Sequence, residues 1–113
     1  MNENSSIPLT ETTLLILMSL STSPRHGYAI IKEAESLSDG RVRFSTGTLY
    51  GALKRLLDEN WIKRVEDPFP VENERERKVY ILAEQGRRVL NTEIQRMGKL
   101  VAIASKQAEQ GAV

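Results

Sequence analysis

The sequence predicts a mainly α-helical fold with one small β-hairpin. Apolar residues recur at helical spacing in three short segments between residues 10 and 58, which indicates three helices. Two segments rich in β-branched and aromatic residues, 61–65 and 78–82, then indicate a pair of strands. A longer apolar stripe begins near residue 84 and predicts a last, long helix.

The first helix is expected from about residue 10 to residue 21. Leu14 to Met18 form an unbroken apolar run that Leu20 extends, so this helix is apolar nearly all round. A helix of this kind is buried on several sides, and we therefore expect it at the centre of the fold.

A turn follows at residues 21–24, and a second, shorter helix is expected over residues 27–37. Ile30, Ile31, Ala34 and Leu37 give this segment its helical spacing. Residues 38–40, Ser-Asp-Gly, break the helix, and a short extended connection follows.

Ser45 is a suitable N-cap for the third helix, because its hydroxyl can accept an amide proton of the first turn. The buried face is then defined by five apolar residues at helical spacing: Leu49, Ala52, Leu53, Leu56 and Leu57. The opposite face centres on Gly47, Gly51, Lys54 and Asp58. Asn60 is expected to end the helix in a left-handed conformation.

The two strands are separated by residues 66–77, which contain two prolines and alternating charges and read as a hairpin loop. The order helix, helix, helix, hairpin is that of a winged helix-turn-helix. We assign residues 1–8 to a flexible tail, 9–82 to the winged helix-turn-helix, 83–108 to the last helix and 109–113 to a second flexible tail.

The last helix, expected over residues 84–107, carries apolar residues spaced alternately by four and three. This spacing is typical of a coiled-coil seam, and a helix so long cannot fold back onto so small a domain. The sequence therefore predicts a homodimer that pairs through Leu90, Ile94, Met97, Val101 and Ala104.

Charge is concentrated in one part of a nearly neutral chain of net charge +1. Residues 41–64 hold six of the 16 Lys and Arg, about +4 in sum, and clustered cations on one helix are typical of a nucleic-acid-binding surface. We expect double-stranded DNA as the partner, bound by Ser45, Thr46, Gly47, Thr48, Tyr50, Gly51, Lys54 and Arg55 of the third helix, by His26 and Tyr28, and by Arg75, Arg77 and Lys78 of the hairpin.

Other readings of these residues stay open. His26 and Tyr28 fit a structural role as well as a phosphate contact, and the charges of the hairpin loop nearly balance, as in a solvated loop. The whole domain also fits a winged-helix module that binds protein without sequence-specific DNA binding.

The composition excludes several other classes. With no cysteine, a single histidine and no carboxylates at ligand spacing, the chain has no residues for nucleophilic or metal catalysis, so we expect no enzyme, no metal and no cofactor. The longest apolar run is too short to cross a bilayer, and residues 1–8 lack the basic region with which a signal peptide begins, so we expect neither a membrane span nor a signal peptide. We expect a cytoplasmic protein without a membrane partner.

The chain resembles the PadR family of bacterial transcriptional regulators, in particular its short members with one C-terminal helix. The resemblance covers residues 12–100 and rests on His26-Gly-Tyr-Ala-Ile-Ile31, Gly47-Thr-Leu-Tyr-Gly-Ala-Leu53, Trp61-Ile62 and Tyr80-Ile-Leu-Ala-Glu-Gln-Gly86. It implies a dimer that binds an operator, usually as a repressor released by a small molecule. Three features depart from the family pattern. Thr46 stands where the family usually has proline, and Leu82-Ala-Glu-Gln-Gly86 replaces Leu-Thr-Glu-Glu-Gly, which removes an N-cap threonine. The only tryptophan, Trp61, is expected at the wing, whereas a family member that binds planar drugs uses a tryptophan of its last helix.

The resemblance, together with the dimer, also implies a place for an effector. A crevice between the subunits would be lined by Leu14, Leu17, Met18, Met97 and Val101, and adaptable methionines would let it accept a small apolar or phenolic molecule.

Overall fold

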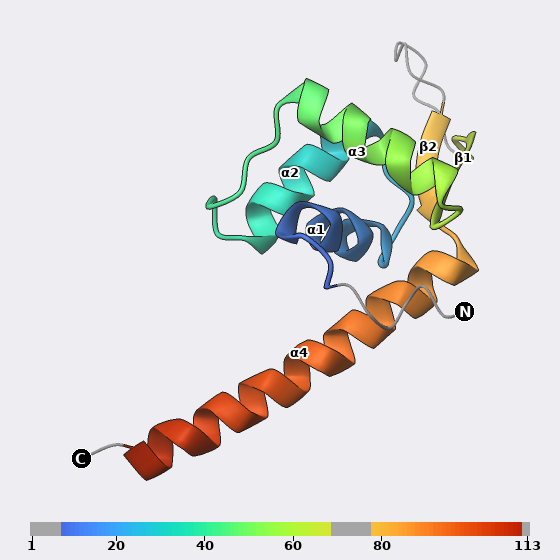
Figure 1. Cartoon of the computed structure of the whole chain (residues 1–113). Helices are drawn as coiled ribbons and strands as arrows, with labels where there is room; N and C mark the ends of the chain where they lie inside the picture. Colours follow the sequence, from blue (N-terminus) through green and yellow to red (C-terminus); the bar gives the residue numbers. More distant parts are fainter. Residues whose placement is uncertain (1–7, 69–77, 112–113) are drawn as a thin grey trace.

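Four helices and a two-stranded hairpin make up the computed structural model, which describes residues 8–68 and 78–111 (Figure 1). This confirms the predicted fold class. The elements are α1 (Glu11–Leu20), α2 (Gly27–Leu37), α3 (Thr46–Asp58), β1 (Ile62–Glu66), β2 (Lys78–Leu82) and α4 (Glu84–Gly111).

Side-chain caps begin two of the helices. The hydroxyl of Thr10 accepts the amide proton of Thr13 at 3.2 Å, and Ser45 does the same for Thr48 at 3.1 Å, as expected for Ser45. Asn60 follows α3 with φ of 64°, the left-handed conformation that asparagine tolerates well. These local signals define α3 to within a residue at each end.

The core surrounds α1, which packs against α2, α4 and β2. Ile16 and Leu17 of α1 are fully buried with Ile30 of α2 and with Leu49 and Leu53 of α3. In Figure 1, α1 lies between α3 on one side and α4 on the other. The central place predicted for the first helix is confirmed.

The hairpin is antiparallel, with Ile62 opposite Leu82 and Glu66 opposite Lys78. β2 has the predicted bounds, whereas β1 begins one residue later than expected, at Ile62. The segment before α2 adds a one-residue bridge to this sheet, because Arg25 and Tyr80 exchange two backbone hydrogen bonds of 3.1 and 2.8 Å. The hairpin is therefore attached to the entry of α2.

The hairpin is also tied to α4 at the junction after β2. Ala83 donates its amide proton to the Trp61 carbonyl at 2.9 Å, which holds the junction without a capping hydroxyl. A side chain at Gly86 would overlap that same carbonyl, so only glycine allows the first turn of α4 to approach β1 so closely.

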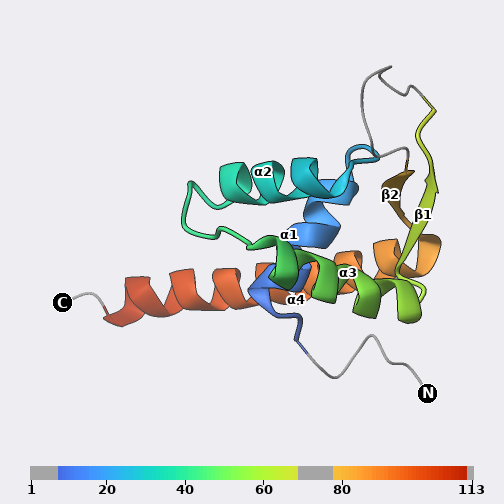
Figure 2. The same cartoon turned by 90° about the horizontal axis from the view of Figure 1, so that it is seen from above.

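α4 packs on the domain only through its N-terminal part, where Gly86, Val89, Leu90 and Glu93 are buried. At 28 residues it is about 42 Å long, and beyond residue 96 its side chains are exposed. In both views its C-terminal half extends away from the other described elements (Figures 1 and 2). The radius of gyration is accordingly 16.4 Å, against about 13 Å for a compact chain of this length.

The predicted C-terminal end of the last helix, near residue 107, is wrong, because α4 continues to Gly111. Residues 109–111, assigned to a flexible tail, are helical. Across residues 8–68 and 78–111, none of the helices has both the length and the apolar character needed to cross a membrane.

Candidate nucleic-acid interface

The outer face of α3 carries all eight of the residues predicted for this helix and its cap. Each of them is exposed, whereas Leu49, Ala52, Leu53 and Leu56 are buried on the opposite side. Since α3 lies across α1 from α4, its outer face is not covered by the long helix (Figure 1). The structure therefore brings the predicted residues together on one open surface.

Three hydroxyls lie at the start of α3, and those of Ser45 and Thr48 form a hydrogen bond with each other. Ser45 accepts the amide proton of Thr48 and donates its own proton to the Thr48 hydroxyl at 3.0 Å. Thr46, the first helical residue, occupies the position where the family usually has proline. Its exposed hydroxyl adds a polar group where the amide groups of the first turn also face outward.

Lys54 lies in the middle of this face and forms an ion pair of 3.6 Å with Asp58, one turn along the helix. Both side chains are exposed, and an exposed pair of this spacing is worth about 0.5 kcal/mol or less. A phosphate or a guanine edge can therefore displace Asp58 at small cost. Arg55 is exposed beside Lys54.

His26 lies where the sequence predicted it, before α2, but its imidazole is directed to the hairpin. Its Nε2 is 2.8 Å from Oδ2 of Asp67, and both side chains are mostly buried. It makes no side-chain cap to α2. This geometry supports the structural reading of His26, and a DNA contact by this residue stays a prediction.

Tyr28 is exposed on the first turn of α2, and its ring lies 5.8 Å from Nζ of Lys32. In the hairpin, Lys78 forms an ion pair of 2.8 Å with Glu66 on the neighbouring strand. Arg75 and Arg77 lie outside the described residues.

Sequence reasoning missed two exposed cations on β1, Lys63 and Arg64. Both belong to the basic segment 41–64, whose predicted DNA contacts are all on α3 and its cap. The burial pattern of the strand, with only Ile62 fully buried, leaves them on the surface next to the end of α3.

The structure removes Leu90 from the predicted dimer seam of α4. Leu90 is only 3% exposed and packs in the core of its own chain, so it cannot pair with a second helix. Ile94, at 49%, and Val101, at 64%, are exposed together with Met97 and Ala104. Leu100 and Ile103, which were not predicted, widen this apolar face.

The sequence predicts Leu17 in the effector crevice, but this residue of α1 is fully buried in the core. Leu14 and Met18 are half-buried at the edge of the core. A molecule cannot reach Leu17 without opening the core.

Glu93 is a buried carboxylate that the sequence did not indicate. It accepts two hydrogen bonds of 2.8 Å from Arg96 and one of 3.1 Å from the backbone amide of Leu9. The hydrogen bond from Arg96 holds the pKa of this carboxyl below its usual value of 4.5, although burial alone would raise the pKa. Glu93 thus fastens the segment before α1 to α4.

Replacing Glu93 by glutamine is expected to lower the free energy of unfolding by about 1–3 kcal/mol at neutral pH, because charge-assisted hydrogen bonds are lost. Since folding lowers the pKa of Glu93, its contribution is present above about pH 4.5 and is lost as the pH falls through the folded value. Urea unfolding of both proteins across this range measures the difference.

Glu84→Gln is the matched control, because Glu84 pairs with Arg88 on the exposed surface of the same helix. We expect a loss of about 0.5 kcal/mol or less for it. Equal losses for the two variants at neutral pH would contradict a special role for Glu93.

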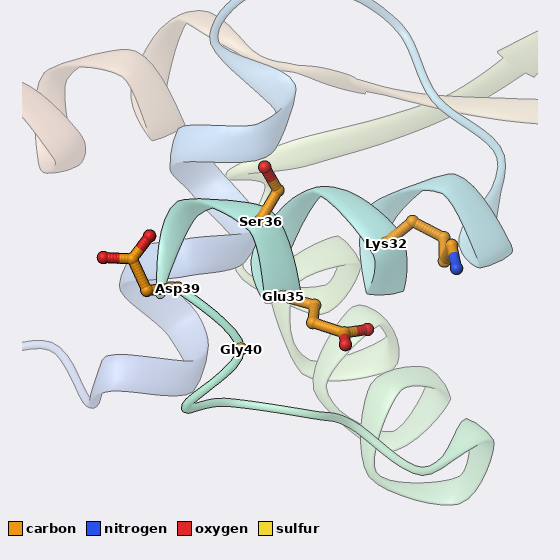
Figure 3. Close-up of a pocket in the computed structure, with 5 residues that line it drawn as sticks. All are labelled: Lys32, Glu35, Ser36, Asp39 and Gly40. Carbon is orange, nitrogen blue, oxygen red and sulfur yellow. The ribbon is translucent and has the colours of Figure 1, made fainter.

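A hollow at the C-terminal end of α2 is lined by Lys32, Glu35, Ser36, Asp39 and Gly40 (Figure 3). In this view the side chains point in different directions and do not converge on one point. Within the described part of the chain, no three His, Cys, Asp or Glu side chains gather in a way that could hold a metal ion. We assign no site there.

Comparison with known proteins shows the family to which this chain belongs. The model of the Transcriptional regulator PadR-like family matches residues 16–92. The chain is 32% identical over 90 residues to an uncharacterized 37.1 kDa protein in transposon TN4556 of Streptomyces fradiae, and this match covers 80% of the chain but only 24% of that relative. The chain thus spans about a quarter of the length of this curated relative.

Many solved structures are similar in fold, among them the following two. A PadR family transcription regulator from hypervirulent Clostridium difficile R20291 has a TM-score of 0.71 at 25% identity, covering 86% of this chain and 97% of that one. Lactococcus lactis ZitR, wild type in complex with DNA, has a TM-score of 0.61 at 20% identity, covering 94% of this chain and 64% of that one.

The family match covers more than half of the chain and includes α2, α3, the hairpin and the first residues of α4 up to 92. Regulators of this family are DNA-binding proteins and not enzymes, in agreement with the sequence prediction. The chain therefore belongs to the Transcriptional regulator PadR-like family and has the winged-helix fold of a PadR family regulator.

Proposed function

We propose that this protein is a homodimeric repressor that binds an inverted-repeat operator through α3 and is released by a small apolar or phenolic effector. The observation that carries the proposal is the outer face of α3, where eight predicted contact residues are exposed together. α3 packs on α2 and β1, which support this surface from behind.

α3 would lie in the major groove with its N-terminal turn nearest the base edges and phosphates. Thr46, Thr48 and Tyr50 would make contacts there, and exposed Gly47 and Gly51 would let the DNA backbone approach closely. Lys54 would exchange Asp58 for a phosphate or a guanine edge.

The hairpin would act as the wing. Lys78, at the end of the hairpin next to the loop, would contact phosphates or the adjacent minor groove, together with Arg75 and Arg77 of the loop. Tyr28, exposed on α2, would contact the backbone beside the groove.

The apolar face of α4 would pair two copies of the chain. Ile94, Met97, Val101 and Ala104 are exposed on it, and apolar surface of this extent on a small protein is typical of an interaction site. Two α3 helices related by a twofold axis would then meet two half-sites about one turn of DNA apart.

Release would act on this spacing. A small apolar or phenolic effector would lie between the subunits against Leu14, Met18, Met97 and Val101, and would favour a dimer whose two α3 helices no longer match the half-sites. A compound that lowers operator affinity while light scattering still shows a dimer supports this step. A compound that acts by splitting the dimer contradicts it.

Lys54→Ala tests the proposed surface most simply. We expect operator binding to weaken by about 1–3 kcal/mol if Lys54 contacts a base edge. If Lys54 contacts phosphate, the loss should be similar on all duplexes. The slope of log affinity against log salt concentration should then decrease by about one. Fluorescence anisotropy with a labelled duplex measures both quantities.

Lys106→Ala is the matched control, since Lys106 is an exposed lysine on the far part of α4. Equal affinity of Lys54→Ala and the unmodified protein would show that α3 does not read DNA through this face. A protein-binding winged helix, the alternative function, would bind random duplex weakly and without a steep decrease in added salt.

A further inference from the structure

The ring of Tyr50 lies on the one residue of α2 that has no side chain. Gly27 is the first residue of α2 and is buried, and Tyr50 is on the second turn of α3. A Cβ atom built on Gly27 would overlap the phenol oxygen of Tyr50 and lie 2.9 Å from its Cζ, a separation that real Cβ atoms essentially never show. Leu49 would be in ordinary contact at 3.4 Å.

The backbone does not by itself require glycine at this position. Gly27 is helical, and among the described glycines only Gly40 has a positive φ. In a helix, alanine is intrinsically favoured over glycine. The close approach of Tyr50 is therefore the reason for glycine that the structure offers.

The other side of the same ring belongs to the candidate DNA surface. Tyr50 is 43% exposed, although its phenol group reaches back to α2. The side chain thus contacts α2 through its phenol end and still contributes to the exposed surface of α3. The orientation of the Tyr50 side chain therefore depends on the space left by the missing side chain of Gly27.

We propose that Gly27 is a positioning residue for DNA binding, which holds the ring of Tyr50 in the orientation that contacts the operator. This inference rests on the proposed function of α3. A side chain at position 27 must displace the far end of the Tyr50 side chain, so the surface then presents the ring in a different place.

A double-mutant cycle separates positioning from simple loss of structure. It comprises the unmodified protein, Gly27→Ala, Tyr50→Ala and the double variant, each measured for affinity to an operator selected from random duplexes and for thermal unfolding. Gly98→Ala is the matched control, because Gly98 is also helical and a Cβ atom there would meet nothing within 4 Å.

We expect Gly27→Ala to weaken operator binding by about fivefold or more, which corresponds to the lower end of the value of a base contact. Once Tyr50 is alanine, Gly27→Ala should cause no further loss, because the ring that it displaces is absent. Gly98→Ala should bind as the unmodified protein does. If Gly27→Ala fails to fold, recovery of folding in the double variant supports the close contact between position 27 and the ring of Tyr50.

Three results would overturn the inference. Gly27→Ala could weaken binding equally with and without the ring of Tyr50, which would indicate a general effect on α2. Gly27→Ala could leave affinity unchanged while Lys54→Ala weakens it, which would keep the proposed function and reject the positioning role. An unmodified protein without salt-dependent DNA binding would reject the proposed function and the inference together.

Discussion

Replacing Ile94 by aspartate is expected to convert the dimer into a folded monomer and to weaken operator binding by a factor on the order of 10² to 10⁴. Ile94 is half exposed in the single chain, so a charge there disturbs the monomer little, whereas it would be buried in the paired helices. A monomer binds one half-site at a time, so it loses the increase in affinity that comes from binding two half-sites with one linked dimer. Light scattering and anisotropy measure the two effects.

Gln95→Asp is the control for this change. It adds the same charge at the next position of α4, which is also exposed and lies on the polar side of the helix. It should remain a dimer with unchanged affinity. A dimer of Ile94→Asp with full operator affinity would show that the apolar face of α4 does not pair the subunits.

Replacing Leu17 by alanine is expected to cost about 2–5 kcal/mol of unfolding free energy, near the upper end because the site is completely enclosed. Leu17 is 0% exposed at the centre of α1, among residues of α2 and α3 that are also fully buried. Many domains of this size are stable by only about 5–15 kcal/mol, so the variant should be partly unfolded at physiological temperature. Urea unfolding measures the loss.

Leu14→Ala is the matched control, since it removes the same atoms from the same helix at a half-buried position. Its cost should be clearly smaller. Equal costs at the two positions would contradict the central place of α1 and the exclusion of Leu17 from an effector crevice.

The parts of the fold that the sequence predicted well depend on local signals. The bounds of α2 and β2 follow from residue types within each segment, and the cap of α3 follows from Ser45 and its neighbours. Exposure of the outer face of α3 could be predicted because Leu49, Ala52, Leu53 and Leu56 define the opposite face by periodicity alone.

The contacts that the sequence did not reveal join residues far apart in the chain. Leu9 and Glu93 are 84 positions apart, and His26 and Asp67 are 41 apart, so no periodic pattern connects them. Gly27 and Tyr50 were both noted in the sequence, but their contact depends on the crossing of α2 and α3.

The apolar stripe of α4 shows a different limit. Its spacing continues without a break from Leu90 to Ala104, although the domain covers Leu90 and leaves Ile94 and Val101 exposed. Periodicity shows that a residue is covered, but not whether its own chain or a second copy covers it.

Selection of bound sequences from a pool of random duplexes tests the central claim, that a dimer reads DNA through α3. The expected product is an inverted repeat whose half-sites are centred about one helical turn apart, with affinity that falls steeply as salt is added. The same selection with Lys54→Ala should give a weaker or less specific sequence. Recovery of unenriched random sequence, or binding that does not depend on salt, would contradict the account.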